Sequence, residues 1–264
     1  MSHATALMYH VLYDGKKEWE SLDAEERPYA ISVSDFNRQL DAIENANISI
    51  LDPDKIINEK SLGDTHHGVI LTFDDGHSSF YRHAYKILKQ RGYRAIFFIT
   101  TDLIEQRTDF CSWDNLAQMT QDGFMVQAHG KTHRFLPDLD NASLELEFQD
   151  PKKLLEQHTG QKVVCMSFPG GRYQPREIEV GKRFGYEVFF TSRIGTITKA
   201  SLKHNYLFDR VPIRHGMKLD TFLVLAQGRA TALWPRKFVY QLKLLLKSLL
   251  GNRFYHVLYQ KLFN

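Results

Sequence analysis

The run Gly68-Val69-Ile70-Leu71-Thr72-Phe73 is followed directly by Asp74-Asp75-Gly76. This apolar run predicts a strand buried on both faces, as in a parallel sheet. Two carboxylates then stand at the carboxyl end of the strand, where active sites gather in α/β sheets and barrels. Because side chains alternate along an extended segment, we expect Asp74 and Asp75 to have different roles. Taken alone, the motif is equally compatible with a solvated turn that caps a helix near Ser79.

Similar apolar runs alternate with helical patterns along most of the chain, which predicts repeated βα units. We predict strands at residues 6–9, 48–51, 69–73, 95–100, 125–128, 163–168, 187–191 and 208–213. This alternation predicts an α/β fold with a parallel sheet or a (β/α) barrel.

Helices are predicted between these strands from apolar side chains at helical spacing and from terminating glycines. Ser34 is the expected cap of a helix with Phe36, Leu40 and Ile43 on one face. Further helices are expected at residues 79–91, 144–159 and 175–184, followed by Gly92, Gly160 and Gly185.

Residues 1–225 contain no linker and are predicted to form one catalytic domain, with residues 226–264 as a helical C-terminal extension. Asp220 is the last acidic residue, so the extension is basic. Pro235 opens an amphipathic pattern that ends at Gly251, and a second short helix is predicted at residues 254–263. The helices of this tail either pack across the domain or make a peripheral contact with an anionic membrane surface.

The composition excludes several classes of protein. A net charge of +3 and a pI near 8.7 give no reason to expect a nucleic-acid partner. Cys111 and Cys165 have no nearby cysteine partner, so neither a disulfide framework nor a cysteine zinc site is expected. The first residues lack a secretory signal pattern, and we expect a cytoplasmic protein, with the basic tail as its one potential membrane contact.

His129 and His133 follow the predicted strand at residues 125–128. In a helical turn, a spacing of four places both imidazoles on one face. Two imidazoles and one carboxylate form a ligand set for Zn²⁺ or a similar divalent ion, with open positions for water and substrate. Gly130 stands where a zinc protease has its catalytic Glu, so the base must come from elsewhere. With 12 histidines in the chain, the pair alone is also compatible with a structural role.

At this point the sequence resembles the NodB-homology polysaccharide deacetylases, carbohydrate esterase family 4. The resemblance runs from residue 6 to about residue 225 and rests on motifs in the family's order: Leu7-Met8-Tyr9-His10, Ser34-x-Phe36-x-x-Gln39-Leu40, Thr72 to Gly76, Trp113-Asp114, His129 to His133, and Ser167-Phe168-Pro169-Gly170-Gly171.

What the resemblance implies is a distorted (β/α) barrel that holds one divalent metal ion, with Zn²⁺ as the expected ion. Asp75, His129 and His133 would be the ligands, and Asp74 the general base. A backbone N–H near Gly171, Arg172 and Tyr173 would stabilise the oxyanion, and His215 would be the general acid. His215 is equally compatible with an ordinary loop histidine.

The chain departs from the family pattern at two places. Ser167 stands where the third motif usually has an Arg, and Arg172 is the residue that we consider as its substitute for orienting Asp74. The usual fourth motif is not recognisable around residues 191–195. His10, at the end of the first predicted strand, either lines the pocket or packs at the strand end.

From these features we expect a metal-dependent hydrolase that removes acetyl groups from N-acetylated sugars of a polysaccharide, an oligosaccharide or a lipid-linked glycan. Trp113, Phe135 and Tyr173 are the aromatic candidates for stacking on sugar rings. The alternatives are an O-acetyl esterase, an amidase on another substrate, and a catalytically weak relative that binds glycan or a membrane.

Overall fold

The computed structural model describes residues 2–62, 67–202 and 206–229. The predicted helices at residues 235–251 and 254–263 therefore lie outside the described residues. Within the described part of the chain, no helix combines the length and the apolar character that crossing a membrane requires.

One large sheet organises the chain, with strand order β10-β1-β5-β6-β7-β8-β9-β11. Its pairings are parallel except the one between β10 and β1. The strands on this path are β1 (His3–Tyr9), β5 (His67–Phe73), β6 (Ile96–Ile99), β7 (Met125–Ala128), β8 (Cys165–Ser167), β9 (Val188–Phe190), β10 (Ile197–Thr198) and β11 (Leu207–Phe208). The short strand β4 (Ser49–Ile50) pairs with β5, and a separate two-stranded sheet joins β2 (Val11–Tyr13) to β3 (Ala30–Ser32).

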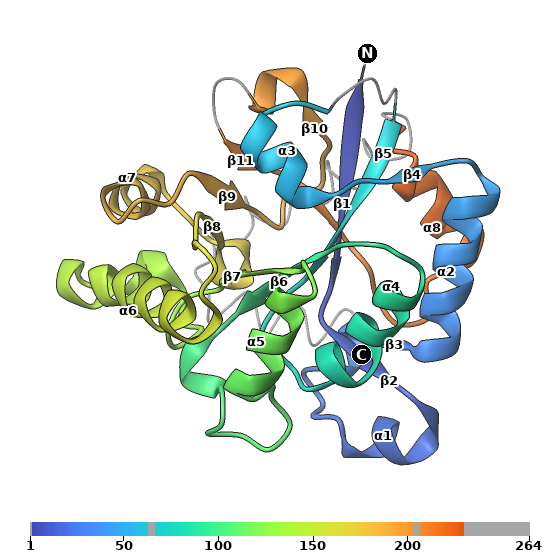
Figure 1. Cartoon of the computed structure of the whole chain (residues 1–264), viewed down its shortest axis with the longest axis horizontal. Coiled ribbons are helices and arrows are strands. Elements are labelled where there is room, and N and C mark those ends of the chain that lie inside the picture. Colours follow the sequence, from blue (N-terminus) through green and yellow to red (C-terminus); the bar gives the residue numbers. More distant parts are fainter. Residues whose placement is uncertain (1, 63–66, 203–205, 230–264) are drawn as a thin grey trace, which may run out of the picture.

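The strand predicted at residues 208–213 is split in two. β11 pairs with β9, whereas β12 (Arg210–Pro212) pairs with β1 at the other end of the sheet. Only Asp209 lies between β11 and β12, so this short segment connects β9 on one side of the sheet with β1 on the other. The sheet is thereby nearly closed. The result is the predicted distorted (β/α) barrel, with the carboxyl end of β1 toward the bottom of Figure 1, where α1 (Gly15–Ser21) and β2 lie.

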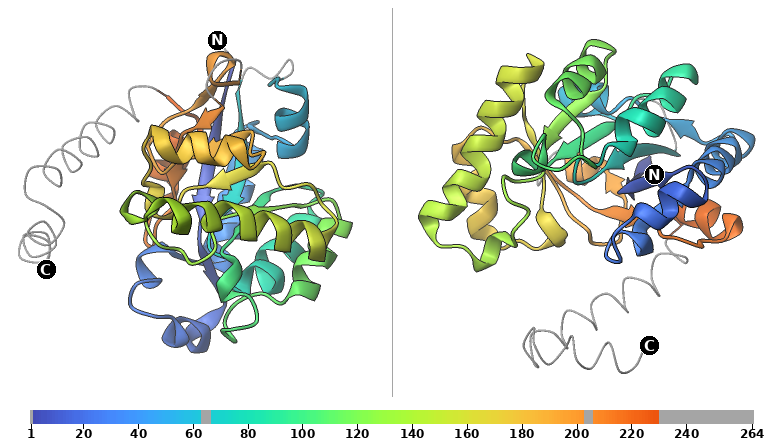
Figure 2. Two further views of the ribbon diagram at one scale, coloured as in Figure 1. Left: turned by 90° about the vertical axis from the view of Figure 1, so that its left-hand side faces the viewer. Right: turned by 90° about the horizontal axis from the view of Figure 1, so that it is seen from below.

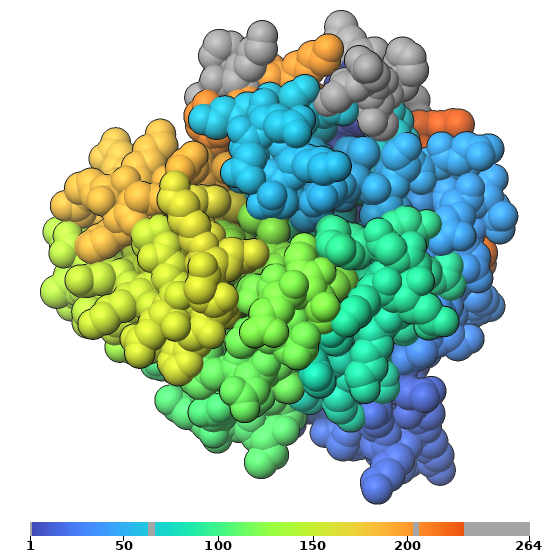
Figure 3. Space-filling model, in the orientation of Figure 1, coloured from blue at the N-terminus to red at the C-terminus, as the bar shows by residue number. Residues whose placement is uncertain are grey.

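Helices surround this barrel (Figure 2). They are α2 (Val33–Asn45), α3 (Pro53–Glu59), α4 (Lys86–Gln90), α5 (Trp113–Gln121), α6 (Asn141–Thr159), α7 (Pro175–Arg183) and α8 (Leu219–Ala226). The predicted helix at residues 79–91 begins with a π-helical turn, Phe80–Tyr85, before α4. α6 ends as predicted, with Gly160 in the left-handed conformation at φ 68. In the space-filling view, the segments from α2 to α7 form one continuous surface (Figure 3).

The strands are buried on both faces, as the apolar run at residues 68–73 predicts. Alternate residues belong to two separate cores. Leu71 and Phe97 pack in the core that includes residues of α2, α5 and α6. Ile70 and Phe98 pack in a second core inside the barrel, to which α3 also contributes apolar side chains.

The cap of α2 differs from the sequence expectation. Ser32, not Ser34, precedes the helix, and its hydroxyl accepts a hydrogen bond from the Asp35 N–H at 2.9 Å. Ser34 lies exposed within the first turn. The local pattern offers two serines, and the pairing of Ser32 with Tyr13 on β2 places the helix start at the first of them.

We therefore expect Ser32→Ala to lower the free energy of unfolding by about 1 kcal/mol, because an N–H of the first turn loses its acceptor. Ser34→Ala is the matched control and should change stability by less than about 0.5 kcal/mol. Urea denaturation of both variants measures the difference. Equal losses would contradict the assignment of Ser32 as the cap.

Candidate functional site

The two adjacent carboxylates leave β5 in different directions. The Asp74 N–H donates to Tyr9 O at 2.9 Å and so continues the pairing with β1. Asp75 then turns out of the strand with φ 89, a backbone region that is costly for any residue except glycine. Such strain concentrates at functional sites, and here it separates the two side chains as the alternation of an extended segment predicts.

His129 and His133 come together, but not on a helical turn. The His129 N–H donates to Ile99 O at 2.8 Å, and the loop that follows contains Gly130 at φ 78 and His133 at φ 63. The predicted helical turn is therefore wrong. Two left-handed residues fold the loop back instead, and the two imidazole ring centroids lie 5.1 Å apart.

Asp75, His129 and His133 form a cluster whose ligand-type atoms all lie within 4.8 Å of one another. Asp75 Oδ1 is 3.2 Å from His129 Nε2 and 3.1 Å from His133 Nε2, yet it is buried without a well-formed hydrogen bond. Burial alone would raise the pKa of the Asp75 carboxyl, but the two imidazoles beside it hold that pKa well below its usual range. An ionised carboxylate with an unused buried oxygen between two imidazoles fits a divalent ion.

The tautomer of His129 supports this interpretation of the cluster. His129 Nδ1 lies 2.8 Å from the carbonyl oxygen of Ser167, and a carbonyl can only accept a hydrogen bond. Nδ1 therefore carries the ring proton, and the lone pair is on Nε2, which faces Asp75. Histidines that bind metals are commonly fixed in this way by an acceptor on the other ring nitrogen.

Glu147 of α6 holds the loop that carries the histidines, and it is only 3% exposed. Its Oε2 accepts hydrogen bonds from the N–H groups of Lys131 at 2.6 Å and Thr132 at 3.1 Å. A Cβ on Gly130 would come within 2.8 Å of that same oxygen, so this position requires glycine. The sequence analysis missed Glu147, although a Glu within the apolar stripe of α6, beside Phe148, is a detectable signal.

Asp74 is fixed by a second residue that the sequence analysis missed. The Arg210 guanidinium donates to both carboxylate oxygens, from Nη1 to Oδ1 and from Nη2 to Oδ2, each at 2.7 Å. The Ser167 hydroxyl donates to Asp74 Oδ2 at 3.0 Å and accepts from Arg210 Nη2 at 2.7 Å. Arg210 therefore performs the orienting task considered for Arg172, and it reaches the carboxylate from β12.

Arg210 and Asp74 are both buried, with exposures of 0% and 2%. Burial alone would raise the pKa of the Asp74 carboxyl, but Arg210 and His129 outweigh this and hold the pKa below its usual range. Asp74 is thus an ionised carboxylate beside the cluster, with its Oδ2 at 3.9 Å from His129 Nε2.

The two histidines considered beside the cluster have different surroundings. His215 is exposed, stacks on Trp19 with ring centroids 4.7 Å apart, and lies with Nδ1 3.2 Å from Ala30 O. His10 has a buried Nδ1 without a hydrogen-bond partner. Burial lowers the pKa of His10, and the nearby carboxylates Asp75 and Asp74 oppose that shift. His10 therefore lies close enough to the cluster for the Asp75 and Asp74 charges to act on its ring.

Residues 171–173 were expected to supply a backbone N–H to the oxyanion, and two of their N–H groups are hydrogen-bonded within a local turn. The N–H groups of Gly171 and Arg172 donate to Phe168 O at 2.8 Å and to Pro169 O at 3.3 Å. The oxyanion role expected for a backbone N–H near Gly171, Arg172 and Tyr173 stays a prediction. The Tyr173 ring stacks on Phe168 with centroids 4.8 Å apart.

Among the three aromatic candidates for sugar stacking, Phe135 is the exposed one, at 38%. It follows the histidine loop and carries the Arg172 guanidinium 4.0 Å from its ring centroid. Trp113 is partly buried and stacks on His158 with ring centroids 4.1 Å apart.

Fold and cluster together define a class: an α/β-barrel protein with one carboxylate and two imidazoles, a candidate ligand set for a divalent ion, at the carboxyl ends of its strands. The family model described as polysaccharide deacetylase matches residues 63–189, which include both Asp74-Asp75 and the histidine loop. Through this segment the chain is similar to the polysaccharide deacetylase family.

A curated relative, the putative polysaccharide deacetylase YxkH of Bacillus subtilis, is 28% identical over 58% of this chain. The match spans about half of that relative, 54% of its length. Among solved structures, the Streptococcus pyogenes deacetylase PplD in complex with acetate superposes with a TM-score of 0.73 at 23% identity, covering 86% of this chain and 99% of that chain. IcaB from Ammonifex degensii gives a TM-score of 0.69 at 23% identity, covering 87% and 98%. These two structures share the fold.

Replacing Arg210 with Gln should lower kcat/KM on acetylated glycan by about 100-fold, because Asp74 loses its orientation. The pKa of Asp74 should also rise. Only the ionised carboxylate can accept a proton, so we expect the acid limb of the kcat/KM profile to move to higher pH. Arg210→Lys keeps the charge and should shift the limb less, and circular dichroism checks that each variant is folded. Arg172→Gln is the control, and a shift of the limb in that variant would contradict the assignment.

Proposed function

We propose that this protein is a metal-dependent hydrolase that removes acetyl groups from N-acetylated sugars of a polysaccharide, an oligosaccharide or a lipid-linked glycan. The observation that carries the proposal is the buried, unused oxygen of Asp75 between two imidazoles, with the ionised Asp74 beside it. The match of residues 63–189 to the polysaccharide deacetylase family model supports the deacetylation, and PplD, which shares the fold, was solved in complex with acetate, the product of such a reaction.

Asp75, His129 and His133 would hold one divalent ion, and Zn²⁺ suits a set of two nitrogens and one oxygen. Such an ion polarises the acetyl carbonyl and makes a bound water acidic. The protein's own contribution is to fix the ligand atoms, through the Ser167 carbonyl on His129 and through Glu147 on the histidine loop.

Asp74 would act as the general base. It stays ionised because Arg210 pairs with both of its oxygens, and the same fork fixes its plane. When water attacks the acetyl carbon, Asp74 takes the proton of that water. The C–N bond then breaks, acetate is formed, and the sugar nitrogen leaves as an amine that needs a proton.

We assign the delivery of that proton to His10 rather than to His215. His10 lies at the end of β1, next to the strand that carries both aspartates, and its Nδ1 is buried without a partner. The His215 ring is occupied by its contacts with Trp19 and Ala30. Burial lowers the pKa of His10, and the charges of Asp75 and Asp74 oppose that shift in favour of the protonated form.

Asp74→Asn should abolish acetate release from N-acetylated glycans, while the protein keeps about one divalent ion per chain, because the amide cannot accept the proton. His129→Ala should lose both the ion and the activity. Acetate release and metal content are measured in the same samples, with O-acetylated glycans in the panel. If His129→Ala leaves both unchanged, or if only O-acetyl groups are removed, the proposal is wrong.

His10→Gln should lower kcat by about 100-fold, which is the usual contribution of a general acid. His215→Gln is the matched control and should keep most of the activity, because the stacking of this ring on Trp19 is not part of the chemistry. Steady-state kinetics on one N-acetylated oligosaccharide separates the two. A large loss in His215→Gln with little loss in His10→Gln would reverse the assignment.

A further inference from the structure

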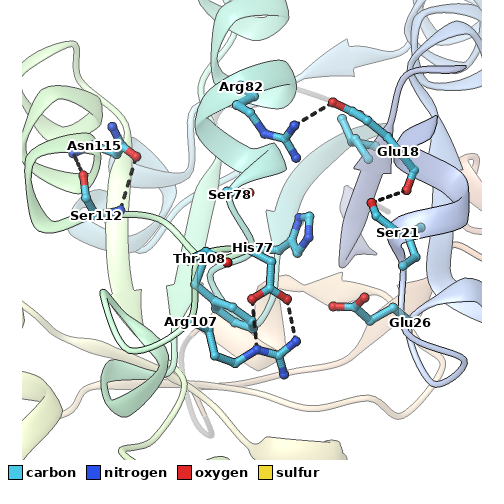
Figure 4. A pocket seen from close by; sticks show the side chains of 14 residues that line it. Glu18, Ser21, Glu26, His77, Ser78, Arg82, Arg107, Thr108, Ser112 and Asn115 are labelled. Carbon is cyan, nitrogen blue, oxygen red and sulfur yellow. Dashed lines mark hydrogen bonds and ion pairs between the residues drawn. The ribbon is translucent and has the colours of Figure 1, made fainter.

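A second group of ionisable side chains lines a polar pocket of about 740 Å³ near α1 and the π-helical turn (Figure 4). Glu26, His77 and Asp109 carry ligand-type atoms that all lie within 4.8 Å of one another. His77 is only 4% exposed, and no residue of this group belongs to the cluster around Asp75. By residue type alone, the group resembles a second metal site.

The hydrogen bonds of His77 argue against a metal. Its Nδ1 accepts the Ser79 N–H at 3.1 Å and lies 2.8 Å from the Ser79 hydroxyl oxygen. That oxygen already accepts the Leu12 N–H at 3.0 Å, so its own hydrogen is free to point at His77. The lone pair of the ring is therefore on Nδ1, and the proton is on Nε2. This is the opposite tautomer from His129, and it makes His77 Nε2 a donor instead of a ligand.

The Nε2–H of His77 has no hydrogen-bond acceptor among the described residues, although the side chain is almost fully buried. Because His77 lines the pocket, this donor is available to a ligand or a water molecule there. The carboxylates of Glu26 and Asp109 carry acceptor atoms within 4.8 Å of a His77 ring nitrogen. A ligand oxygen bound between them would accept from His77 and donate to a carboxylate.

The charges of the pocket are mostly balanced within its walls, which disfavours a free cation. Asp109 pairs with Arg107, whose Nε donates to Asp109 Oδ1 at 3.0 Å. Glu18 on the opposite wall pairs with Arg82 at 2.6 Å. Glu26 has no ion-pair partner among the described residues, and its Oε2 accepts the Asp23 N–H at 2.9 Å. The pocket thus offers both donors and acceptors, which suits hydroxyl groups.

We infer that this pocket binds a sugar unit of the glycan chain, separate from the unit that carries the reacting acetyl group. One hydroxyl of that sugar accepts from His77 Nε2–H and donates to Glu26 or Asp109. Leu22 and Phe110 in the lining supply apolar surface for the C–H groups of the ring. The inference rests on the proposed function, because it extends the binding of the same substrate.

The pocket lies close enough to the cluster for one glycan to reach both. His77 follows Asp75 by two residues, a backbone span of at most about 7 Å. The Asp75 and Asp109 charges both act on the His77 ring. A glycan longer than a disaccharide therefore gains contacts here that a shorter one lacks.

The test uses the full chain loaded with Zn²⁺ and carrying Asp74→Asn, so that binding is measured without turnover. Chito-oligosaccharides of two to six N-acetylglucosamine units are titrated by calorimetry. We expect the affinity to rise with chain length, and we expect Glu26→Ala to remove about tenfold of that gain, the usual effect of losing a hydrogen bond to a charged group. The affinity for the disaccharide should stay the same. Glu25→Ala, at an exposed neighbouring position, is the matched control.

Four results would overturn the inference. An equal loss for the disaccharide and the hexasaccharide would mean that Glu26 supports the fold. If the affinity does not depend on chain length, while the unmodified enzyme still releases acetate from these oligosaccharides, the pocket is not a subsite. The proposed function would then remain intact. A second Zn²⁺ per chain that disappears in Glu26→Ala would make the pocket a metal site. The absence of acetate release from any acetylated glycan would remove both proposals.

Discussion

The buried ion pair between Arg210 and Asp74 is the interaction on which the candidate site depends. Both partners are removed from water, which costs several kcal/mol per ion, and only a well-formed pair offsets that cost. Here the geometry is bidentate, and Ser167, Thr72 and the Thr191 carbonyl take further N–H groups of the guanidinium. Removing one partner would leave an uncompensated buried charge, at a cost of about 3–5 kcal/mol.

The pair also explains the unusual end of the barrel. Arg210 is the first residue of β12. It follows Asp209, where the chain passes from its pairing with β9 to its pairing with β1. Its guanidinium carbon lies 5.6 Å and 5.8 Å from the ring centroids of Phe98 and Phe190 inside the barrel. The pairing of β12 with β1 therefore brings the Arg210 guanidinium to the Asp74 carboxylate. The strand that closes the barrel is thus also the strand that orients Asp74.

Local sequence patterns were enough to predict much of the fold and the approach of Asp75 to the two histidines. The strand before Asp74 and the end of α6 at Gly160 depend on residues close by in the sequence. A continuous apolar run predicts the first, and a glycine after a helical pattern predicts the second. Asp75 and His129 follow β5 and β7, which flank β6 in the sheet, and the carboxyl ends of parallel strands meet at one edge. The prediction that the buried strand β5 leads directly into the site is therefore confirmed.

The support of the site was not predictable in the same way. Arg210 and Asp74 are 136 residues apart, and no local pattern links them. The geometry of the histidine loop also escaped prediction, because it depends on Glu147, a long-range anchor, and on a strained φ at His133. A helical turn is the simplest local solution for a spacing of four, and the tertiary contacts replaced it.

The central claim is that Asp75, His129 and His133 hold one ion that the reaction requires. The most direct measurement removes divalent ions with a chelator and then follows acetate release from an N-acetylated glycan while Zn²⁺ is titrated back. The account predicts no activity in the metal-free protein and full recovery at about one equivalent per chain. Undiminished acetate release without any bound ion would contradict it.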